Sequence, residues 1–246
     1  MAFGQSEFAS ELKALGINVS RETLQRLEIY AALLAKWQAK INLVGPATLP
    51  DLWRRHFLDS AQLLNLLPRA GGGLRWGRSL SSAQSAEATP TPTLPQLGGG
   101  GSGERGVLVD LGSGAGFPGL VLAIMTNWRI HLIDSDQRKC AFLRQVALDC
   151  GVFDRITIHA KRIEQVAGMA AEVVTARACA PLDELLKLAA PIVGEAGKCL
   201  LLKGAQVEEE LTQAQQHWTM RLERWGSITD PAGSILVITH LRQKSQ

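Results

Sequence analysis

The 246-residue sequence has no cysteines spaced as C-x-x-C, gives no secretory cue, and has no hydrophobic run long enough to cross a bilayer. Its four cysteines, Cys140, Cys150, Cys179 and Cys199, are therefore predicted to be reduced and mostly buried thiols. The first residues, M-A-F-G-Q-S-E, have neither the basic start nor the apolar core of a signal peptide. These absences argue against a disulfide scaffold and an integral membrane protein, and we expect a cytoplasmic protein.

The sequence also lacks a strong excess of charge of either sign. Lys and Arg number 26 and Asp and Glu number 23, so the formal net charge is +3. This mild basic excess is compatible with a nucleic-acid partner but does not establish one. Hydrophobic residues make up 46% of the chain, which is enough for a substantial core, and the length suits one full domain with a smaller addition.

Helical spacing of apolar residues marks residues 1–70, which we predict to form a small N-terminal helical unit. The first helix is expected to end near Gly16. Ser20 is placed to cap a second, longer helix, whose apolar stripe is expected to reach Ile41.

A third helix is predicted to open at Thr48, which together with Asp51 resembles a capping box. Apolar and polar residues alternate along it with a helical period. The side chains expected to face inward are Trp53, Phe57, Leu64 and Leu67, and those expected to face outward are Arg54, Arg55, Asp59 and Gln62.

Residues 71–105 differ in kind from the rest of the chain. They consist mostly of Gly, Ser, Thr, Pro, Ala and Gln, including T-P-T-P-T and G-G-G-G-S-G. So few apolar side chains cannot offset the entropy lost on ordering the segment. We expect a flexible low-complexity linker, followed by a ligand-binding domain over residues 106–246.

From residue 106 onward, short apolar runs alternate with helical patterns, as an α/β sheet requires. Five parallel strands are expected near residues 107–110, 130–133, 156–159, 172–176 and 198–203. Two further runs, at residues 222–228 and 235–241, are predicted to form an antiparallel hairpin around D-P-A-G-S. This pattern fits the doubly wound sheet of class I methyltransferases better than a six-stranded parallel dinucleotide fold.

The densest glycine cluster follows the first of these strands, where residues 107–119 read V-L-V-D-L-G-S-G-A-G-F-P-G. A strand, a glycine turn and a helix in succession are typical of a nucleotide-like ligand bound at the carboxyl ends of strands. Gly112, Gly114 and Gly116 permit positive φ and let the backbone approach a ligand closely. The segment is therefore predicted to be a ligand-binding loop.

The residues themselves favour S-adenosylmethionine as that ligand over a dinucleotide. Three of the glycines match G-x-G-x-x-G, which alone is a weak indication of a dinucleotide. Asp110 extends the pattern to D-x-G-x-G-x-G, and Pro118 lacks the N–H that a pyrophosphate would need. Asp134, at the end of the next strand, is placed to accept ribose hydroxyls from either ligand and does not discriminate.

Seven short segments outside the linker point to one family of proteins. They are W-x-x-K-x-N-L-V (37–44), R-H-F-L-D-S (55–60), D-L-G-S-G-A-G-F-P-G (110–119), D-S-D-Q-R-K-x-x-F-L (134–143), R-I-E (162–164), T-A-R-A-x-A-P-L (175–182) and K-G (203–204). With them the chain resembles the RsmG family, also called glucose-inhibited division protein B. The members are small-subunit ribosomal RNA guanine-N7 methyltransferases. The chain departs from the family in its long insertion and in Cys140 and Cys179 at otherwise variable positions.

The resemblance implies S-adenosylmethionine as the cofactor, small-subunit ribosomal RNA or the assembling subunit as the partner, and no metal. It implies that Arg177 faces the cofactor or the incoming RNA, and we expect it to serve both. The predicted cofactor contacts, with Gly114 taken from the glycine turn, are Gly112, Gly114, Phe117, Asp134, Ser135, Asp136, Ile163, Glu164 and Arg177.

Guanine N7 has an in-plane lone pair and no proton, so its methylation needs no general base. We therefore expect no acid–base dyad, and we predict a capping or packing role for His56 and Asp59. Phosphate contacts would make RNA affinity salt-dependent. The basic residues expected near the cleft are Lys40, Arg54, Arg55, Arg138, Lys139, Arg162 and Lys203.

Three other classes of protein stay open at this point. A methyltransferase acting on a small molecule or a protein would share the glycine loop. A non-catalytic nucleotide-binding module would bind S-adenosylmethionine without turnover, and an NAD-dependent oxidoreductase would bind the nicotinamide cofactor instead. We expect a monomer.

Overall fold

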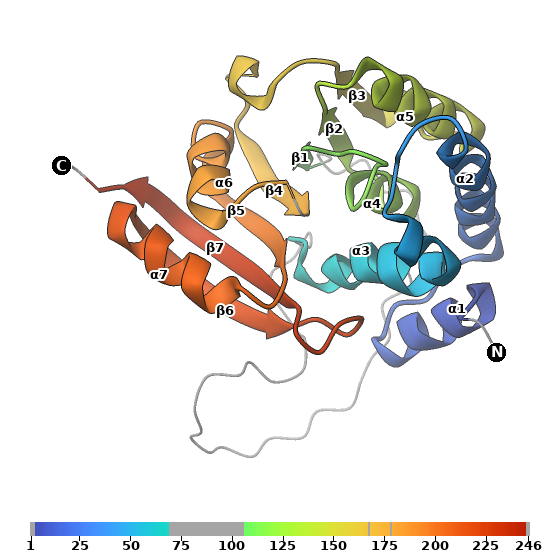
Figure 1. The fold of residues 1–246 in the computed structure, drawn as a ribbon, viewed down its shortest axis with the longest axis horizontal. Coiled ribbons are helices and arrows are strands. Elements are labelled where there is room, and N and C mark those ends of the chain that lie inside the picture. Colours follow the sequence, from blue (N-terminus) through green and yellow to red (C-terminus); the bar gives the residue numbers. More distant parts are fainter. Residues whose placement is uncertain (1–2, 69–105, 167, 178, 245–246) are drawn as a thin grey trace.

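The computed structural model describes residues 3–68, 106–166, 168–177 and 179–244 as a twisted sheet with helices on both faces (Figure 1). Seven strands make up this sheet, in the order β3-β2-β1-β4-β5-β7-β6. The segment predicted to be a linker, residues 71–105, lies outside the described residues.

The sheet confirms the predicted fold class. The strands are β1 (Val107–Leu111), β2 (Arg129–Ile133), β3 (Ile156–His159), β4 (Ala171–Arg177), β5 (Val193–Lys203), β6 (Trp218–Gly226) and β7 (Ser234–Gln243). β1 to β5 are parallel, and β7 runs antiparallel to both of its neighbours. The predicted hairpin is β6–β7, and β7 lies between β5 and β6, which is the arrangement of a class I methyltransferase sheet.

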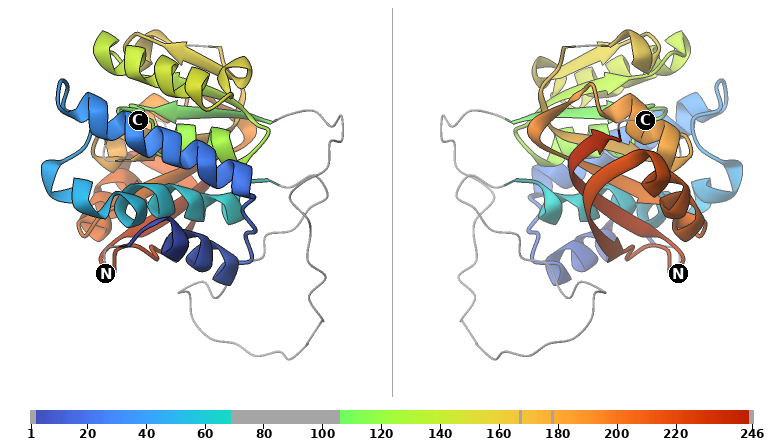
Figure 2. Two further views of the ribbon diagram at one scale, coloured as in Figure 1. Left: turned by 90° about the vertical axis from the view of Figure 1, so that its right-hand side faces the viewer. Right: turned by 90° about the vertical axis from the view of Figure 1, so that its left-hand side faces the viewer.

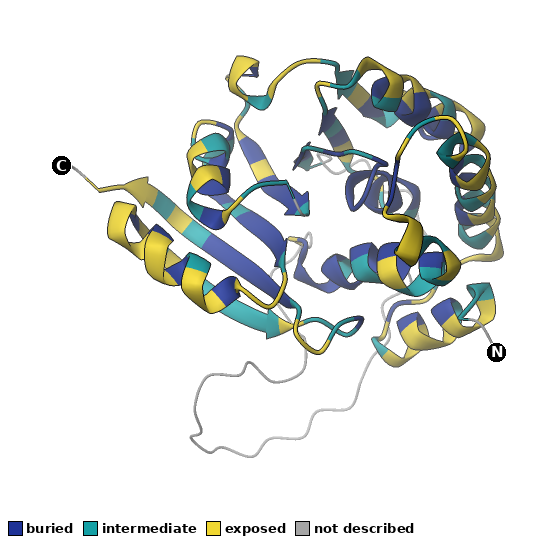
Figure 3. Ribbon diagram, viewed as in Figure 1, coloured by how far each residue is buried: buried dark blue, intermediate teal, exposed yellow. Residues whose placement is uncertain are grey.

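Side chains alternate between the two faces of the sheet and so form two hydrophobic clusters. Leu108 belongs to one cluster, and Val109 to the other. The helices between the strands are α4 (Gly119–Met125), α5 (Gln137–Asp149), α6 (Leu182–Ala189) and α7 (Val207–His217), with the single turns η4 (Phe153–Arg155) and η5 (Ile163–Gln165). Figure 3 shows that buried residues follow the strands of the sheet.

The N-terminal helices share the first of these clusters with the sheet. In α1 (Gln5–Ala14) and α2 (Arg21–Gln38), buried side chains such as Phe8 and Tyr30 belong to the same cluster as Leu108 of β1 and Phe142 of α5. These helices lie on one side of the sheet, and α6 and α7 lie on the other (Figure 2). The N-terminal helices and the sheet therefore have one hydrophobic core in common.

Helix α2 ends earlier than predicted, since Ile41 lies beyond its last residue, Gln38. The Gln38 side chain accepts hydrogen bonds from the backbone N–H groups of Leu43 (3.0 Å) and Val44 (3.1 Å) and donates to the Val44 carbonyl at 2.9 Å. These bonds hold the chain in a turn immediately after the helix, which ends the apolar stripe.

The predicted capping box at Thr48 is wrong. The helical segment begins at Pro46 and continues through η1 (Pro46–Asp51), η2 (Trp53–Leu58), α3 (Asp59–Ala61) and η3 (Gln62–Leu66). Thr48 therefore lies inside the first turn, where its hydroxyl donates to the Gly45 carbonyl at 2.8 Å. Proline at the first helical position starts the segment two residues earlier.

The predicted outward orientation of Asp59 and Gln62 is also wrong. Gln62 is 2% exposed, and the Asp59 side chain is 15% exposed. Both side chains turn toward the segment that connects β6 and β7, with which they form hydrogen bonds. These partners lie more than 160 residues away in the chain, so helical periodicity could not indicate them. Among the described residues, no helix has both the length and the hydrophobicity needed to cross a membrane.

Candidate functional site

A cavity of about 960 Å³ lies at the carboxyl ends of the parallel strands. Its walls come from the glycine loop after β1, the end of β2, the segment after β4, the end of β5, the N-terminal segment from Leu43 to Asp59, and the β6–β7 connection. The predicted cofactor contacts that line it are Gly112, Gly114, Phe117, Asp134, Ser135 and Arg177. The site is thus at the edge of the sheet where a doubly wound fold binds its ligand.

The glycine loop needs its glycines for conformation and for space. Gly112, Gly114 and Gly116 have φ values of +63°, +55° and +95°, as the sequence predicts. A Cβ on Gly112 would come closer than 3.0 Å to the Cys179 sulfur, and one on Gly116 would lie 2.8 Å from the Tyr30 hydroxyl. The backbone at Gly112 therefore packs directly against the segment after β4.

Asp134 joins the glycine loop to the segment after β2. One carboxylate oxygen accepts the Gly114 N–H and the other accepts the Asp136 N–H, both at 2.8 Å. A carboxylate oxygen has room for a second donor. Asp134 can therefore accept a ligand hydroxyl while it holds the loop in place, as a ribose requires.

Asp110 lies beneath the loop and is fully buried. Its carboxylate accepts hydrogen bonds from the Thr175 hydroxyl at 2.8 Å and the Gly119 N–H at 3.3 Å. Burial raises the pKa of Asp110 to about 6, although these hydrogen bonds and one from Ser113 act in the opposite direction. Asp110 therefore connects β1, β4 and the start of α4, and it supports the loop from below.

Phe117 is the aromatic floor of the cavity, and N-terminal residues hold it. Its ring stacks on Tyr30, with centroids 5.2 Å apart and planes 16° apart, and Phe57 meets it edge-on at 5.4 Å. The Tyr30 hydroxyl donates a hydrogen bond to the Ala115 carbonyl within the glycine loop. Helix α2 and η2 thereby fix the conformation of the ligand-binding loop.

Arg177, at the end of β4, bridges the cavity wall to the N-terminal helices. Its Nη1 donates to the Arg55 carbonyl at 3.1 Å and lies 3.5 Å from Asp59 Oδ2, while its Nη2 lies 2.7 Å from His56 Nδ1. The guanidinium carbon is 5.2 Å from the centroid of the Phe117 ring. The predicted packing role of His56 and Asp59 thus takes the form of contacts with Arg177.

The β6–β7 connection forms a wall that the sequence analysis did not place in the site. Asp59 Oδ1 accepts the Thr229 hydroxyl at 2.6 Å, and the Gln62 side-chain oxygen accepts the Ile228 N–H at 3.1 Å. Arg55 pairs with Asp230 at 3.2 Å. The D-P-A-G-S sequence indicated a turn here, but no sequence signal linked it to the N-terminal helices.

Lys203 and Glu210 support the segment after β4 from the other side. The Lys203 ammonium donates to the Ala180 carbonyl at 3.0 Å and pairs with Glu210 at 2.5 Å, and Glu210 accepts the Leu182 N–H at 2.7 Å. Both residues line the cavity. The K-G segment indicated Lys203, whereas Glu210 carried no sequence signal.

Three predicted cofactor contacts, Asp136, Ile163 and Glu164, are not among the residues that line the cavity. Asp136 caps α5 by accepting the Arg138 N–H at 2.8 Å, and the other two lie in η5. Their contact with the cofactor stays a prediction. Of the seven basic residues expected near the cleft, Arg55, Lys139 and Lys203 line the cavity, and Lys40, Arg54, Arg138 and Arg162 do not.

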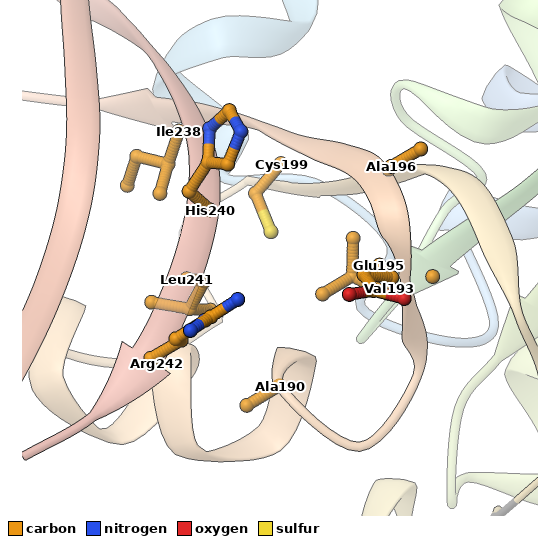
Figure 4. Close-up of a pocket in the computed structure, with 11 residues that line it drawn as sticks. Ala190, Val193, Glu195, Ala196, Cys199, Ile238, His240, Leu241 and Arg242 are labelled. Carbon is orange, nitrogen blue, oxygen red and sulfur yellow. The ribbon is translucent and has the colours of Figure 1, made fainter.

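A second cavity, of about 520 Å³, lies between the start of β5 and the end of β7 (Figure 4). Val193, Cys199, Ile238 and Arg242 are among its lining residues. None of the predicted cofactor contacts reaches it, and it is at the opposite end of β5 from Lys203. The larger cavity is therefore the candidate ligand site. The described residues include no cluster of three His, Cys, Asp or Glu side chains that could hold a metal ion.

Comparisons with known proteins identify the family of this chain. The profile of the GidB family, described as rRNA small subunit methyltransferase G, matches residues 23–72 and 101–230. The ribosomal RNA small subunit methyltransferase G of Paramagnetospirillum magneticum is 50% identical over 228 residues, which cover 93% of this chain and 92% of that protein. The protein of the same name from Rhodospirillum rubrum is 46% identical over 233 residues, covering 95% and 98%.

A solved structure matches more distantly. A SAM-dependent O-methyltransferase from Thermotoga maritima is 14% identical, with a TM-score of 0.45, over 58% of this chain and 62% of that chain. The assignment rests on the sequence relatives, which extend over nearly the whole chain. This chain belongs to the rRNA small subunit methyltransferase G family.

Proposed function

We propose that this protein transfers the methyl group of S-adenosylmethionine to N7 of a guanine in small-subunit ribosomal RNA. The observation that carries the proposal is the single cavity that extends from the glycine loop and Asp134 to Arg177 and the β6–β7 connection. Such a cavity holds a cofactor and an acceptor base side by side. We further propose that the protein acts as a monomer in the cytoplasm.

The cofactor half of the cavity fits S-adenosylmethionine. Gly112 and Gly114 bring backbone to the cavity surface without side chains, and Asp134 keeps lone pairs free for ribose hydroxyls. Phe117, which follows these glycines, also lines the cavity. No phosphate site is needed, which agrees with Pro118 in the loop.

The acceptor half is lined by polar and basic groups. Arg55 and Arg177 stand along the N-terminal wall, Lys203 along the opposite wall, and Thr229 and Asp230 on the β6–β7 connection. Arg177 can donate in a planar fork to a phosphate or to the O6 edge of guanine. The target guanine must leave its stack to enter this half, so a loop or unpaired nucleotide is the expected substrate.

The reaction requires little proton transfer by the protein. S-adenosylmethionine supplies an activated methyl group on a sulfonium. Since guanine N7 carries no proton, the residues need only align the base with that group and exclude competing water, and positioning can supply about 7–11 kcal/mol of the barrier. Phe117 and Arg177 do the aligning on one side and the β6–β7 connection on the other.

The proposal is tested by transfer of a labelled methyl group from S-adenosylmethionine to naked small-subunit RNA and to assembled subunits, followed by identification of the modified base. We expect 7-methylguanosine at a single position. Transfer to another atom or another class of acceptor, or tight S-adenosylmethionine binding with no transfer to either substrate, would overturn it. Calorimetry with NAD should show no binding.

A further inference from the structure

The hydrogen bonds around His56 allow only one assignment of donors and acceptors. A guanidinium nitrogen has donors and no acceptor, so the 2.7 Å contact between Arg177 Nη2 and His56 Nδ1 requires an unprotonated Nδ1. A neutral ring then carries its proton on Nε2, which lies 2.8 Å from the Thr48 hydroxyl. Thr48 in turn donates to the Gly45 carbonyl at 2.8 Å. The bonds therefore run from Arg177 through His56 and Thr48 to Gly45.

This series of bonds follows the wall of the cavity, because all four residues line it. His56 also rests on the same aromatic floor as Arg177: its ring centroid is 4.9 Å from that of Phe117. The imidazole and the guanidinium are thus held against one ring, and a bond between them fixes their separation.

The surroundings of His56 keep its ring neutral. The residue is 6% exposed. Burial, and then the charges of Arg177 and Arg55, lower the pKa of His56 to about 3. The acidic groups nearby are already paired, Asp59 with Arg177 and Asp230 with Arg55. Protonation at Nδ1 would place a second cation against Arg177 and break the bond.

Arg177 keeps donors for a ligand after these contacts are made. A guanidinium has five N–H groups, and the contacts with the Arg55 carbonyl, His56 and, at the longer distance of 3.5 Å, Asp59 use three of them. The side chain is 20% exposed and lines the cavity. Its remaining N–H groups are available to an oxygen acceptor that enters the cavity.

We propose that His56 is a positioning residue. As the neutral Nε2–H tautomer, it holds the Arg177 guanidinium on Phe117. The remaining N–H donors of Arg177 are then directed at the oxygen acceptors of the RNA substrate. The inference rests on the proposed methyl transfer to RNA. It adds to that function the residue that orients the RNA-facing arginine, and it places Thr48 behind His56 as the group that selects the tautomer.

The tautomer can be measured without any activity. Nitrogen NMR of the full chain with labelled histidine distinguishes the two neutral tautomers, and loss of one signal set in His56→Asn assigns His56 among the five histidines. We expect the Nε2–H form, with no protonation from neutral pH down to about pH 5. An Nδ1–H tautomer, or a ring that titrates at the ordinary histidine pKa, would overturn the proposal.

Variants test the positioning itself. His56→Phe keeps the ring on Phe117 but removes the acceptor for Arg177, and we expect kcat/KM for RNA to fall about tenfold or more while S-adenosylmethionine affinity changes less than about threefold. His56→Asn places an amide oxygen near the Nδ1 position and should recover most of that loss. His217→Phe makes the same chemical change on α7 outside the cavity and is the control.

These outcomes are separate from those of the proposed function. If the unmodified protein does not methylate small-subunit RNA, the proposed function fails, whatever the tautomer of His56. If it does methylate RNA, equal activities of His56→Phe and the unmodified protein overturn the positioning role. So does a parallel loss of cofactor and RNA affinity, because that result would assign His56 to the general packing of the cavity wall.

Discussion

Substitution of Gly112 by alanine tests whether the close contact with Cys179 shapes the glycine loop. The new methyl group meets two obstacles. At φ +63° an L-residue costs about 1–2 kcal/mol relative to the right-handed region. The Cβ also comes closer than 3.0 Å to the Cys179 sulfur and lies 3.2 Å from its Cβ, an overlap of the kind that costs about 1–3 kcal/mol. Gly112→Ala should therefore lower the free energy of unfolding by about 2–5 kcal/mol.

Gly114→Ala is the matched control for this experiment. Gly114 has a similar φ of +55°, but its nearest neighbour, the Gly112 carbonyl oxygen, is 3.8 Å from the added Cβ. Only the backbone term applies there, so the expected loss is about 1–2 kcal/mol. The difference between the two variants isolates the overlap with Cys179.

The double variant Gly112→Ala/Cys179→Ala removes the sulfur, which is the closer of the two contacts, and should recover most of the loss caused by the overlap; the backbone term and the 3.2 Å contact with the Cβ at position 179 are left. Urea denaturation without cofactor, analysed for the unmodified protein and the three variants at one pH, gives the free energies. Equal losses at Gly112 and Gly114, or no recovery in the double variant, would refute the assignment of the contact to Cys179.

Three further variants address the supports of the site. Tyr30→Phe should cost about 1–2 kcal/mol in urea denaturation, since the Ala115 carbonyl loses its donor while the ring stack is kept; an unchanged stability would contradict this. Asp59→Ala should speed amide hydrogen exchange at Thr229 and lower stability by about 2 kcal/mol or more, and unchanged exchange there would argue against the link. For Asp110 the native pKa of about 6 exceeds the unfolded value of 3.8, so the native state binds more protons between them. The stability of the unmodified protein relative to Asp110→Asn should then fall by about 3 kcal/mol from about pH 4 to about pH 7 and change little above; a constant difference would refute the raised pKa.

The parts of the fold that were predicted correctly depend on neighbours in sequence. The period of the apolar residues predicted where the strands lie. The positive φ values between β1 and α4 were predicted from the glycines there, because positive φ is a property of single residues. Asp134 was placed at the cavity because the end of a strand in a parallel sheet is at the ligand edge.

The parts that could not be predicted depend on partners far along the chain. Asp59 and Gln62 are polar residues of the kind that usually lie on an exposed helix face. Here the β6–β7 connection covers that face and forms hydrogen bonds with both side chains. Asp136 shows a different difficulty. An aspartate after a strand and before a helix suits both a ligand contact and an N-cap, and the structure uses its carboxylate as the cap of α5.

The bonds between the N-terminal helices and the β6–β7 connection also determine when the site can form during protein synthesis. Asp59 leaves the ribosome 170 residues before Thr229, and Arg55 precedes Asp230 by 175. Contacts of such high sequence separation form late, so nascent chains that already contain the glycine loop still lack one wall of the cavity. A truncated product that ends within β6 would therefore leave the polar face of the N-terminal helices without its partner. The acceptor half of the cavity is therefore complete only after the β6–β7 connection has been synthesised and has reached Asp59 and Gln62.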